Sequence, residues 1–468
     1  MAKTKSPYIL TFILVLGLVL RLINIDQSFW LDEASQAQMS SLPVSQIWFG
    51  RGADFHPPMF YFLAHAWLSF GRSEIWLRLL PLTFGLADMY LIYVFAKDLF
   101  PDKYINIKHW TLDIKHLASL MLAVSPFHIY YSQEFRMYSL LSFLGTLSIY
   151  LLYRKKYLTL GLVNALMLYT HYSGIFLIFA QTVYVLFYAR KHAKNLAVSH
   201  LLIIVIFLPW LPQFFRQLGS GLNIDHYLPG WRNVLSISPL KAFPVIIFKI
   251  IAGRISFISR YLYGIYITFV FFVTFASLGL ASMHKRFLFI WAIVPVFSLL
   301  LTSLLLPQNQ PFRVIYILPA FVLLMVQACL RYPRLFTALI FYIFLVGDIA
   351  YFTRPRLQRE QWRQAMAFLQ TRPGPVLIKS SSVFAPIDWY APGLSVYPVV
   401  SSYPAEYSSV AARLDSVANL PELYLMEYLT GLTDPGLNVE KALRANHFIQ
   451  TGIYDYPGVG FIYRYQKI

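Results

Sequence analysis

Long apolar runs separated by short polar loops fill the first three quarters of the chain. About eleven of them predict membrane-spanning helices, because a span needs roughly 20 residues. The runs to either side of His171 have almost no loop between them, so we expect two short helices that form a tight pair. The predicted spans are 8–25, 76–96, 114–131, 135–153, 158–170, 172–189, 197–215, 261–283, 287–306, 313–330 and 335–352.

Basic side chains are concentrated in alternate loops of this pattern. Residues 357–468 hold nine basic and nine acidic side chains, so the net charge of +18 comes entirely from the membrane part. A basic excess in short loops marks the cytoplasmic side, which puts the N-terminus in the cytoplasm and the C-terminus outside. The clusters are Lys3/Lys5, Lys97 to Lys115, Arg154 to Lys156, Arg190 to Lys194, Lys285/Arg286 and Arg331/Arg334.

Two further apolar segments conflict with this topology. Counting residues 57–70 as a span would put the cluster Lys97 to Lys115 outside, so we interpret them as an interfacial or re-entrant helix. Residues 241–259 carry Lys241, Lys249 and Arg254, and counting them as a span would reverse everything downstream. We expect an outer interfacial helix there, although it strains the positive-inside rule.

The composition defines the fold class. With 58% hydrophobic and 13% charged residues, the chain is typical of a multi-pass membrane protein, which we expect in the cytoplasmic membrane. The predicted fold is an all-α transmembrane domain (1–352) and a small extracytoplasmic α/β domain (353–468). Within the latter we expect helices at 359–370 and 439–445 and a strand at 375–378, with further apolar runs at 423–426 and 460–463.

Two classes of function are disfavoured by the same composition. No basic stripe with interleaved aromatic residues lies on a soluble face, which argues against a nucleic-acid partner. The single cysteine, Cys329, lies in an apolar run, so we expect neither a disulfide framework nor a thiol metal site.

The candidate chemical groups all fall on the predicted outer side. Carboxylates beside hydrocarbon are costly and indicate a site, and Asp32-Glu33 and Glu134 lie at span ends among aromatic residues. An outer carboxylate can act as general base toward an acceptor hydroxyl, and an Arg can hold a departing phosphate bidentately. This combination suits group transfer from a lipid-linked donor. The full set is Asp32, Glu33, Asp54, His56, Glu74, Glu134, Arg136, His171 and Arg313.

Some of these residues have alternative roles. His56, before Pro57-Pro58, is placed to bind phosphate, to ligate a metal or simply to face water. Arg313 is placed to hold a phosphate, or to anchor the chain at lipid headgroups. No cofactor is required by the sequence; a divalent cation bridging Asp32 or Glu134 to a phosphate is compatible with it.

A series of motifs resembles the GT-C superfamily of membrane glycosyltransferases. It resembles in particular bacterial enzymes similar to dolichyl-phosphate-mannose–protein mannosyltransferases and aminoarabinose transferases, over nearly the whole chain. The motifs are Trp30-Leu31-Asp32-Glu33-Ala34, His56-Pro57-Pro58-Met59, Gly71-Arg72-Ser73-Glu74, Arg78-Leu79-Leu80-Pro81, Ser125 to Glu134 with Arg136 and Tyr138, Arg313 with Pro319, and Gln361-Trp362-Arg363-Gln364-Ala365.

The resemblance implies an inverting transferase that takes a sugar from a polyprenyl-phosphate donor at the outer face. The acceptor is a glycan, a lipid or a protein. The family's catalytic carboxylate falls on Asp32, with Glu33 beside it and Glu134 as a polar group of the second outer loop. His56, Arg136, Tyr138, His171 and Arg313 would bind the donor phosphate or substrate. His56 favours the mannosyltransferase branch, since aminoarabinose transferases have Lys there. The C-terminal domain differs from the β-trefoil of eukaryotic members.

A transporter or flippase of lipid-linked sugars is the main alternative. Transporters usually place polar groups near the bilayer midplane, with repeat symmetry. The clustering of acids at one face and the lack of a sequence repeat favour the enzyme.

Overall fold

The computed structural model describes residues 6–50, 55–107, 110–227, 229–255, 257, 259–282, 285–417 and 419–468. By contacts the chain forms two compact units. The first, here called the membrane unit, comprises residues 1–25, 43–219 and 235–357. The second, the α/β unit, comprises residues 26–42, 220–234 and 358–468. The α/β unit thus takes in the segment that carries Asp32 and Glu33. The predicted domain boundary at 352/353 stays a prediction.

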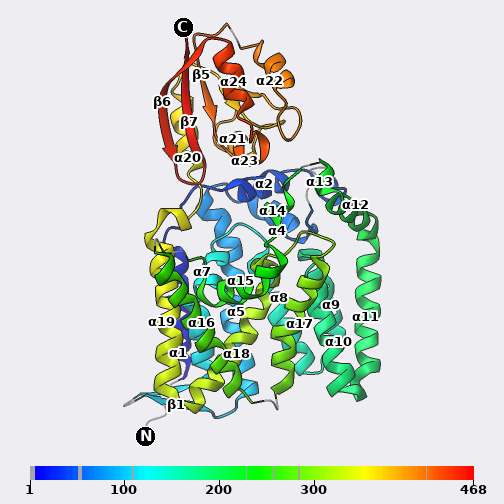
Figure 1. The fold of residues 1–468 in the computed structure, drawn as a ribbon. Coiled ribbons are helices and arrows are strands. Elements are labelled where there is room, and N and C mark those ends of the chain that lie inside the picture. The colour runs from blue at the N-terminus through cyan, green and yellow to red at the C-terminus, as the bar shows by residue number, and fades with distance from the viewer. Residues whose placement is uncertain are drawn as a thin grey trace. The chain divides into compact units, whose positions relative to one another are not determined.

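The membrane unit is a bundle of helices that run side by side (Figure 1). Its helices are α1 (Ser6–Leu22), α3 (Val44–Trp48), α4 (Met59–Leu68), α5 (Glu74–Leu99), α6 (Ile114–Ala123), α7 (Pro126–Ser132), α8 (Tyr138–Tyr153), α9 (Tyr157–Thr170), α10 (Gly174–Tyr188), α11 (Ala193–Phe207), α12 (Leu211–Leu222), α15 (Pro239–Ala252), α16 (Arg260–Leu280), α17 (Arg286–Thr302), α18 (Leu318–Arg331) and α19 (Pro333–Thr353). Short 3₁₀ turns are η1 (Arg190–His192), η2 (Leu208–Trp210), η4 (Pro311–Ile317) and η5 (Pro355–Leu357).

Six stretches of the described chain are long and apolar enough to cross a membrane: 74–99, 190–222, 232–252, 260–280, 311–331 and 333–353. Seven shorter apolar helices accompany them, among them α9 and α10, which confirms the expected short pair. The stretch 232–252 includes α15, so it qualifies as a span by length and composition. The interfacial placement of 241–259 and the total of about eleven spans stay predictions.

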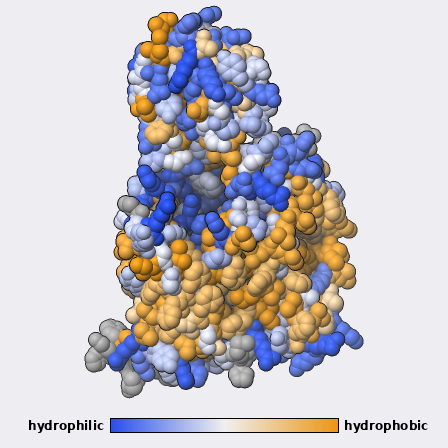
Figure 2. All heavy atoms as spheres, viewed as in Figure 1, coloured by the Kyte–Doolittle hydropathy of each residue, from blue (hydrophilic) through white to orange (hydrophobic). Residues whose placement is uncertain are grey.

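The surface of the membrane unit carries the signature of a bilayer protein. Figure 2 shows a broad hydrophobic band across it, with hydrophilic side chains at the lower edge in this view. Large apolar side chains such as Phe272, Leu301 and Leu208 are more than half exposed in this unit. Such a continuous apolar surface is stable against lipid and unstable in water.

Prolines break two of the predicted spans. The span 114–131 consists of α6 and α7, because Pro126 lacks an N–H and begins a new helix. The span 197–215 is interrupted by the 3₁₀ turn η2, which contains Pro209. The first break separates α6 from α7, which leads into the candidate site.

One element of the membrane unit was missed by the sequence analysis. A two-stranded antiparallel hairpin, β1 (Tyr104–Ile107) with β2 (Trp110–Asp113), lies within the basic segment between α5 and α6. The all-α description of this part of the chain is therefore wrong at this loop. The run Tyr-Ile-Asn-Ile alternates as a strand does, but it is short and lies among lysines, so it was not recognised as a strand.

A buried polar network fixes α7 within the bundle. The Arg21 guanidinium donates to Nδ1 of His128 (2.7 Å) and to the Ala123 carbonyl (2.9 Å). Nε2 of His128 lies 3.4 Å from Asp88, which also accepts from Ser142 (2.6 Å). The network links α1, α5, α7 and α8, and buried hydrogen bonds of this kind favour one packing. Nε of Arg21 and one carboxylate oxygen of Asp88 have no hydrogen-bond partner among the described residues.

The α/β unit is built on a five-stranded mixed sheet in the order β4-β3-β5-β7-β6. The strands β3 (Val376–Ile378), β4 (Val396–Pro398) and β5 (Glu422–Met426) are parallel, whereas β7 (Gly460–Lys467) pairs antiparallel with β5 and with β6 (Phe448–Tyr456). The helices are α2 (Leu31–Ser40), α13 (Ile224–Tyr227), α14 (Arg232–Leu235), α20 (Trp362–Gln370), α21 (Ala385–Tyr390), α22 (Tyr407–Leu414), α23 (Thr430–Thr433) and α24 (Asn438–Ala445).

Alternation along β3 explains the layers of this unit. Leu377 faces a core formed with α22 and α24, while Val376 and Ile378 face a second core formed with α20 and α21. The two helices and the strand expected in this region are present as α20, α24 and β3, and the two further apolar runs lie in β5 and β7. Strands β4 and β6 were not predicted. Leu31 packs against the second core, which is why α2 belongs to this unit.

Candidate active site

The loop between α7 and α8 is held firmly inside the membrane unit. The Gln133 amide donates to the carbonyls of Arg21 (3.0 Å) and Ile23 (2.6 Å) and accepts from the Tyr351 hydroxyl (2.8 Å). Glu134 follows and is buried, with 1% of its surface exposed. This anchoring gives the acidic and basic side chains of the loop a defined position.

Four of the predicted site residues meet beside this loop. An Arg136 nitrogen lies 3.5 Å from Nε2 of His56 and 3.4 Å from the Tyr138 hydroxyl. Its guanidinium also lies 5.7 Å from the centre of the Tyr138 ring, within cation–π range. The His171 ring lies 5.6 Å from His56 and 6.2 Å from Tyr138. Residues from three segments of the sequence thus form one cluster.

His171 is held as a neutral ring. Its Nδ1 accepts from the backbone N–H of Ser173 (3.1 Å), which places its proton on Nε2. Burial lowers the pKa of His171 well below its usual value, and the positive charges of His56, Arg313 and Arg136 lower it further. At neutral pH the ring therefore adds a hydrogen-bond donor to the cluster without adding charge.

Arg313 joins this cluster through its backbone and through a neighbouring ring. The Ser173 hydroxyl donates to the Arg313 carbonyl, and Phe312 lies 4.7 Å from the Tyr138 ring. The Arg313 side chain donates to the Pro307 carbonyl (3.3 Å). Its Nε is shielded from solvent and has no hydrogen-bond partner among the described residues. A shielded cationic donor of this kind is suited to an anionic ligand.

Sequence reasoning missed Arg254, which extends the cluster. Arg254 follows the end of α15, donates to the Tyr130 hydroxyl and lies 4.7 Å from the centre of that ring. Tyr130 contacts Tyr131 at 5.0 Å, and Tyr131 contacts Tyr138 at 5.3 Å. The sequence did give a sign of this residue: the basic residues at 241–259 lie on the predicted outer side, against the positive-inside rule.

Asp32 and Glu33 lie in the α/β unit, in the first turn of α2. Acidic side chains are favoured there by the helix dipole. Glu33 is fully buried and Asp32 is half-buried. The backbone N–H of Leu31 donates to Glu360 (3.1 Å), so the start of α2 is tied to the segment that leads into α20.

Glu360 is a second residue that the sequence analysis did not select. Burial raises its pKa, and the charge of Asp32 adds to this. Hydrogen bonds from Trp362 (2.6 Å), Leu31 and Tyr428 (3.2 Å) act in the opposite direction. The motif Gln361-Trp362 marked the right segment. The hydrogen bond of Glu360 with α2 could not be seen from the sequence, because the two positions are more than 300 residues apart.

The predicted site residues therefore fall into two sets. His56, Arg136, Tyr138, His171 and Arg313 come together in the membrane unit, where Glu134 is buried in the same loop. Asp32 and Glu33 belong to the α/β unit. Asp54 lies outside the described residues. Among the described residues no group of three or more His, Cys, Asp or Glu side chains could hold a metal ion. A divalent cation at Asp32 or Glu134 stays a prediction.

The arrangement of the helices is one that is known from solved membrane proteins. Among the structures that share this fold is ArnT from Cupriavidus metallidurans. Its apo structure is 12% identical with a TM-score of 0.57, and its complex with undecaprenyl phosphate is 13% identical with a TM-score of 0.58. Each alignment covers 98% of this chain and 97% of ArnT. The predicted GT-C fold is thereby confirmed.

A further solved structure aligns weakly with the chain, and the sequence itself has no match. The S. cerevisiae Pmt1-Pmt2 protein O-mannosyltransferase complex bound to the sugar donor aligns over 51% of the chain with a TM-score of 0.33, too distant to support an argument. No family model and no curated protein matches the sequence.

Proposed function

We propose that this protein is an inverting glycosyltransferase that moves a sugar from a polyprenyl-phosphate donor to an acceptor hydroxyl. The observation that supports this most is the cationic and aromatic cluster around Arg313, with its shielded Nε donor. ArnT, whose fold the chain shares, has been seen bound to undecaprenyl phosphate. A lipid phosphate is the ligand that such a cluster would bind within a membrane protein.

The proposed reaction is a single displacement. The acceptor oxygen bonds to the anomeric carbon while the bond from that carbon to the phosphate oxygen breaks, which inverts the configuration. The acceptor proton passes to the Asp32 carboxylate, acting as general base. The electron pair of the broken bond stays on the polyprenyl phosphate, whose negative charge is stabilised by Arg313 and Arg136.

The remaining residues have supporting roles in this proposal. His56, Tyr138 and His171 orient the donor phosphate through hydrogen bonds, Glu134 contributes a polar contact to the substrates, and Glu33 supports Asp32. The reaction takes place at the outer face of the cytoplasmic membrane, with the α/β unit outside, as the Lys and Arg distribution predicts. The acceptor is a glycan, a lipid or a protein hydroxyl.

Asp32→Asn tests the proposal most directly. The amide keeps the shape but accepts no proton, and losing a general base typically slows a reaction about 10²–10⁴-fold. We expect kcat for transfer from a polyprenyl-phosphate sugar to fall by that factor while donor binding is retained. Asp415→Asn, at an exposed acid of the same unit, is the matched control and should keep full activity.

Glu33→Gln completes the experiment. Its effect should be milder if Glu33 only supports Asp32. Full turnover by Asp32→Asn together with loss of turnover in Glu33→Gln would mean that Glu33 is the general base and Asp32 the supporting residue. Full turnover by both variants would refute the catalytic role of this acidic pair. Absence of transfer by the unchanged protein would refute the enzyme and leave the transporter of lipid-linked sugars as the alternative.

A further inference from the structure

A cavity lies at the end of the bundle where basic residues are concentrated. It is enclosed by the end of α8, the start of α9, the end of α10, η1 and the start of α17, and has a volume of about 290 Å³. Its lining residues are Ile149, Leu152, Tyr153, Lys155, Tyr157, Tyr184, Val185, Tyr188, Ala189, Lys191, His192 and Phe287. None of them belongs to the cluster around Arg313.

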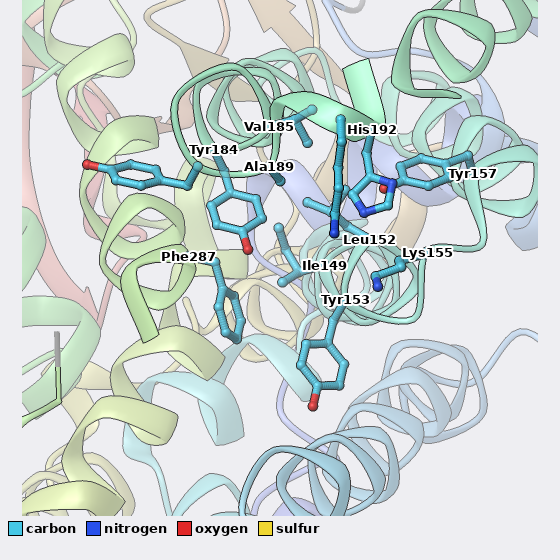
Figure 3. Close-up of a pocket in the computed structure, with 12 residues that line it drawn as sticks. Ile149, Leu152, Tyr153, Lys155, Tyr157, Tyr184, Val185, Ala189, His192 and Phe287 are labelled. Atoms are coloured by element: carbon cyan, nitrogen blue, oxygen red, sulfur yellow. The ribbon is translucent and has the colours of Figure 1, made fainter. Parts of the chain in front are cut away.

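The two sides of this cavity differ in chemistry. Figure 3 shows Lys155 and His192 on one side and Tyr184 with Phe287 on the other. His192 packs against Tyr157 at 5.8 Å, and Tyr184 meets the edge of Phe287 at 6.1 Å. Because these rings hold one another, the cavity is formed without a ligand. It combines cations and phenol hydroxyls with an apolar floor.

The lysines of the cavity are not neutralised by the protein. Within the described part of the chain, neither the Lys155 nor the Lys191 ammonium has a hydrogen-bond or ion-pair partner. The neighbouring Arg154, by contrast, pairs with Asp98 at 2.9 Å. Two adjacent cations without a protein counter-ion attract an anion from outside.

The backbone conformation at Lys155 is also unfavourable for a lysine. Lys155 follows the end of α8 in a left-handed conformation, with φ of 58°. The N–H groups of Lys156 and Lys155 bond to the carbonyls of Leu151 (2.9 Å) and Leu152 (3.0 Å). This is the helix-ending motif in which glycine is the favoured residue. A lysine here is disfavoured for the turn, so its side chain has another use.

The surroundings indicate a ligand that comes from the membrane. Leu158 is 65% exposed and Phe187 is 76% exposed, and both are next to lining residues on α9 and α10. Apolar side chains exposed beside a basic cavity favour a ligand with both an anionic head and acyl chains. We propose that this cavity binds the phosphate headgroup of an anionic phospholipid, whose chains lie along α9 and α10.

The test measures lipid binding to the full-length protein, purified in detergent and stripped of lipid. Native mass spectrometry would titrate dioctanoyl phosphatidylglycerol, phosphatidylcholine of the same chain length, and inorganic phosphate. We expect saturable binding of phosphatidylglycerol alone. Lys155→Gly and Lys191→Gln should each weaken it about fivefold, since one basic residue contributes about 1 kcal/mol of attraction to anionic lipid.

Lys156→Gln is the matched control, because it removes an adjacent exposed lysine that does not line the cavity. It should leave the affinity unchanged. Lys155→Gly also relieves the left-handed turn, so weaker binding by a protein of equal or higher thermal stability supports the proposal. Equal losses in Lys156→Gln and Lys155→Gly, equal binding of phosphatidylcholine, or saturation by inorganic phosphate at the same concentration would each overturn it.

Discussion

A buried lysine of the α/β unit and a half-buried arginine of the membrane unit are treated very differently by the fold. Lys379 follows β3 in the α/β unit and is fully buried. Its ammonium donates to the carboxylates of Glu427 and Glu440, and Asp434 lies at 3.8 Å. Arg313 in the membrane unit has the Pro307 carbonyl as its side-chain acceptor and a shielded Nε without a partner among the described residues.

The difference separates a charge that the protein neutralises from one that it leaves without a counter-ion among the described residues. Lys379 joins the ends of the adjacent strands β3 and β5 to α24, and Asp434 also caps α24 by accepting from the N–H groups of Asn438 (2.8 Å) and Val439 (3.0 Å). A cation neutralised in this way holds its unit together and has no capacity left for a ligand. Arg313 keeps that capacity, at the cost of an unsatisfied donor.

Removing Lys379 should have the largest effect on stability. Lys379→Met leaves three carboxylates around an apolar side chain, and breaking a buried ion pair typically costs about 3–5 kcal/mol. We expect the α/β unit to unfold at a clearly lower temperature, measured by thermal unfolding of the purified protein. Lys441→Met, at an exposed lysine of α24, is the control. Unchanged stability in Lys379→Met would mean that the cluster does not hold the unit together.

Removing Arg313 should instead affect transfer and spare stability. A hydrogen bond to a charged group contributes about 1.5–3 kcal/mol, so Arg313→Ala should lower kcat/KM about 10–100-fold. Arg313→Lys should recover only part, because the planar fork is lost. The control is Arg331→Ala at the exposed far end of α18. Full activity in Arg313→Ala would reduce this residue to an interfacial anchor.

The smallest expected effect is a change in the pH dependence of stability. Burial raises the pKa of Glu440 to about 7, with hydrogen bonding to Glu427 adding to the rise, whereas an unfolded Glu titrates near 4.5. The folded state therefore binds more protons between these values. The contribution of Glu440 to stability is therefore fully present below about pH 4.5 and is lost as the pH rises through 7.

Glu440→Gln should weaken this pH dependence. The measurement is the difference in unfolding temperature between pH 5 and pH 7.5 for the variant and the parent protein. The same decrease in both proteins would show that other groups, such as Glu360, cause it.

The sequence alone was sufficient for the broad architecture. Apolar runs of about 20 residues predict helices in a membrane whatever their neighbours, since backbone groups in lipid must bond within their own segment. The boundaries of α8 and α18 accordingly fall close to the predicted spans. Short continuous apolar runs were likewise enough to mark β3 and β5, whereas β6, with mostly exposed or half-buried side chains, lacked an apolar signal.

Which side chains act together was decided by tertiary structure. His56 and His171 are 115 positions apart yet their rings lie 5.6 Å from each other, and Glu360 accepts from the N–H of Leu31 across 329 positions. The acids and bases could be chosen from the sequence because charge near hydrocarbon is costly wherever it occurs. Their neutralisation could not, because the partners of a buried charge are set by packing: Lys379 and Arg313 are both basic residues at the edge of apolar runs, and only the folded chain surrounds one with carboxylates and leaves the other a donor for a ligand.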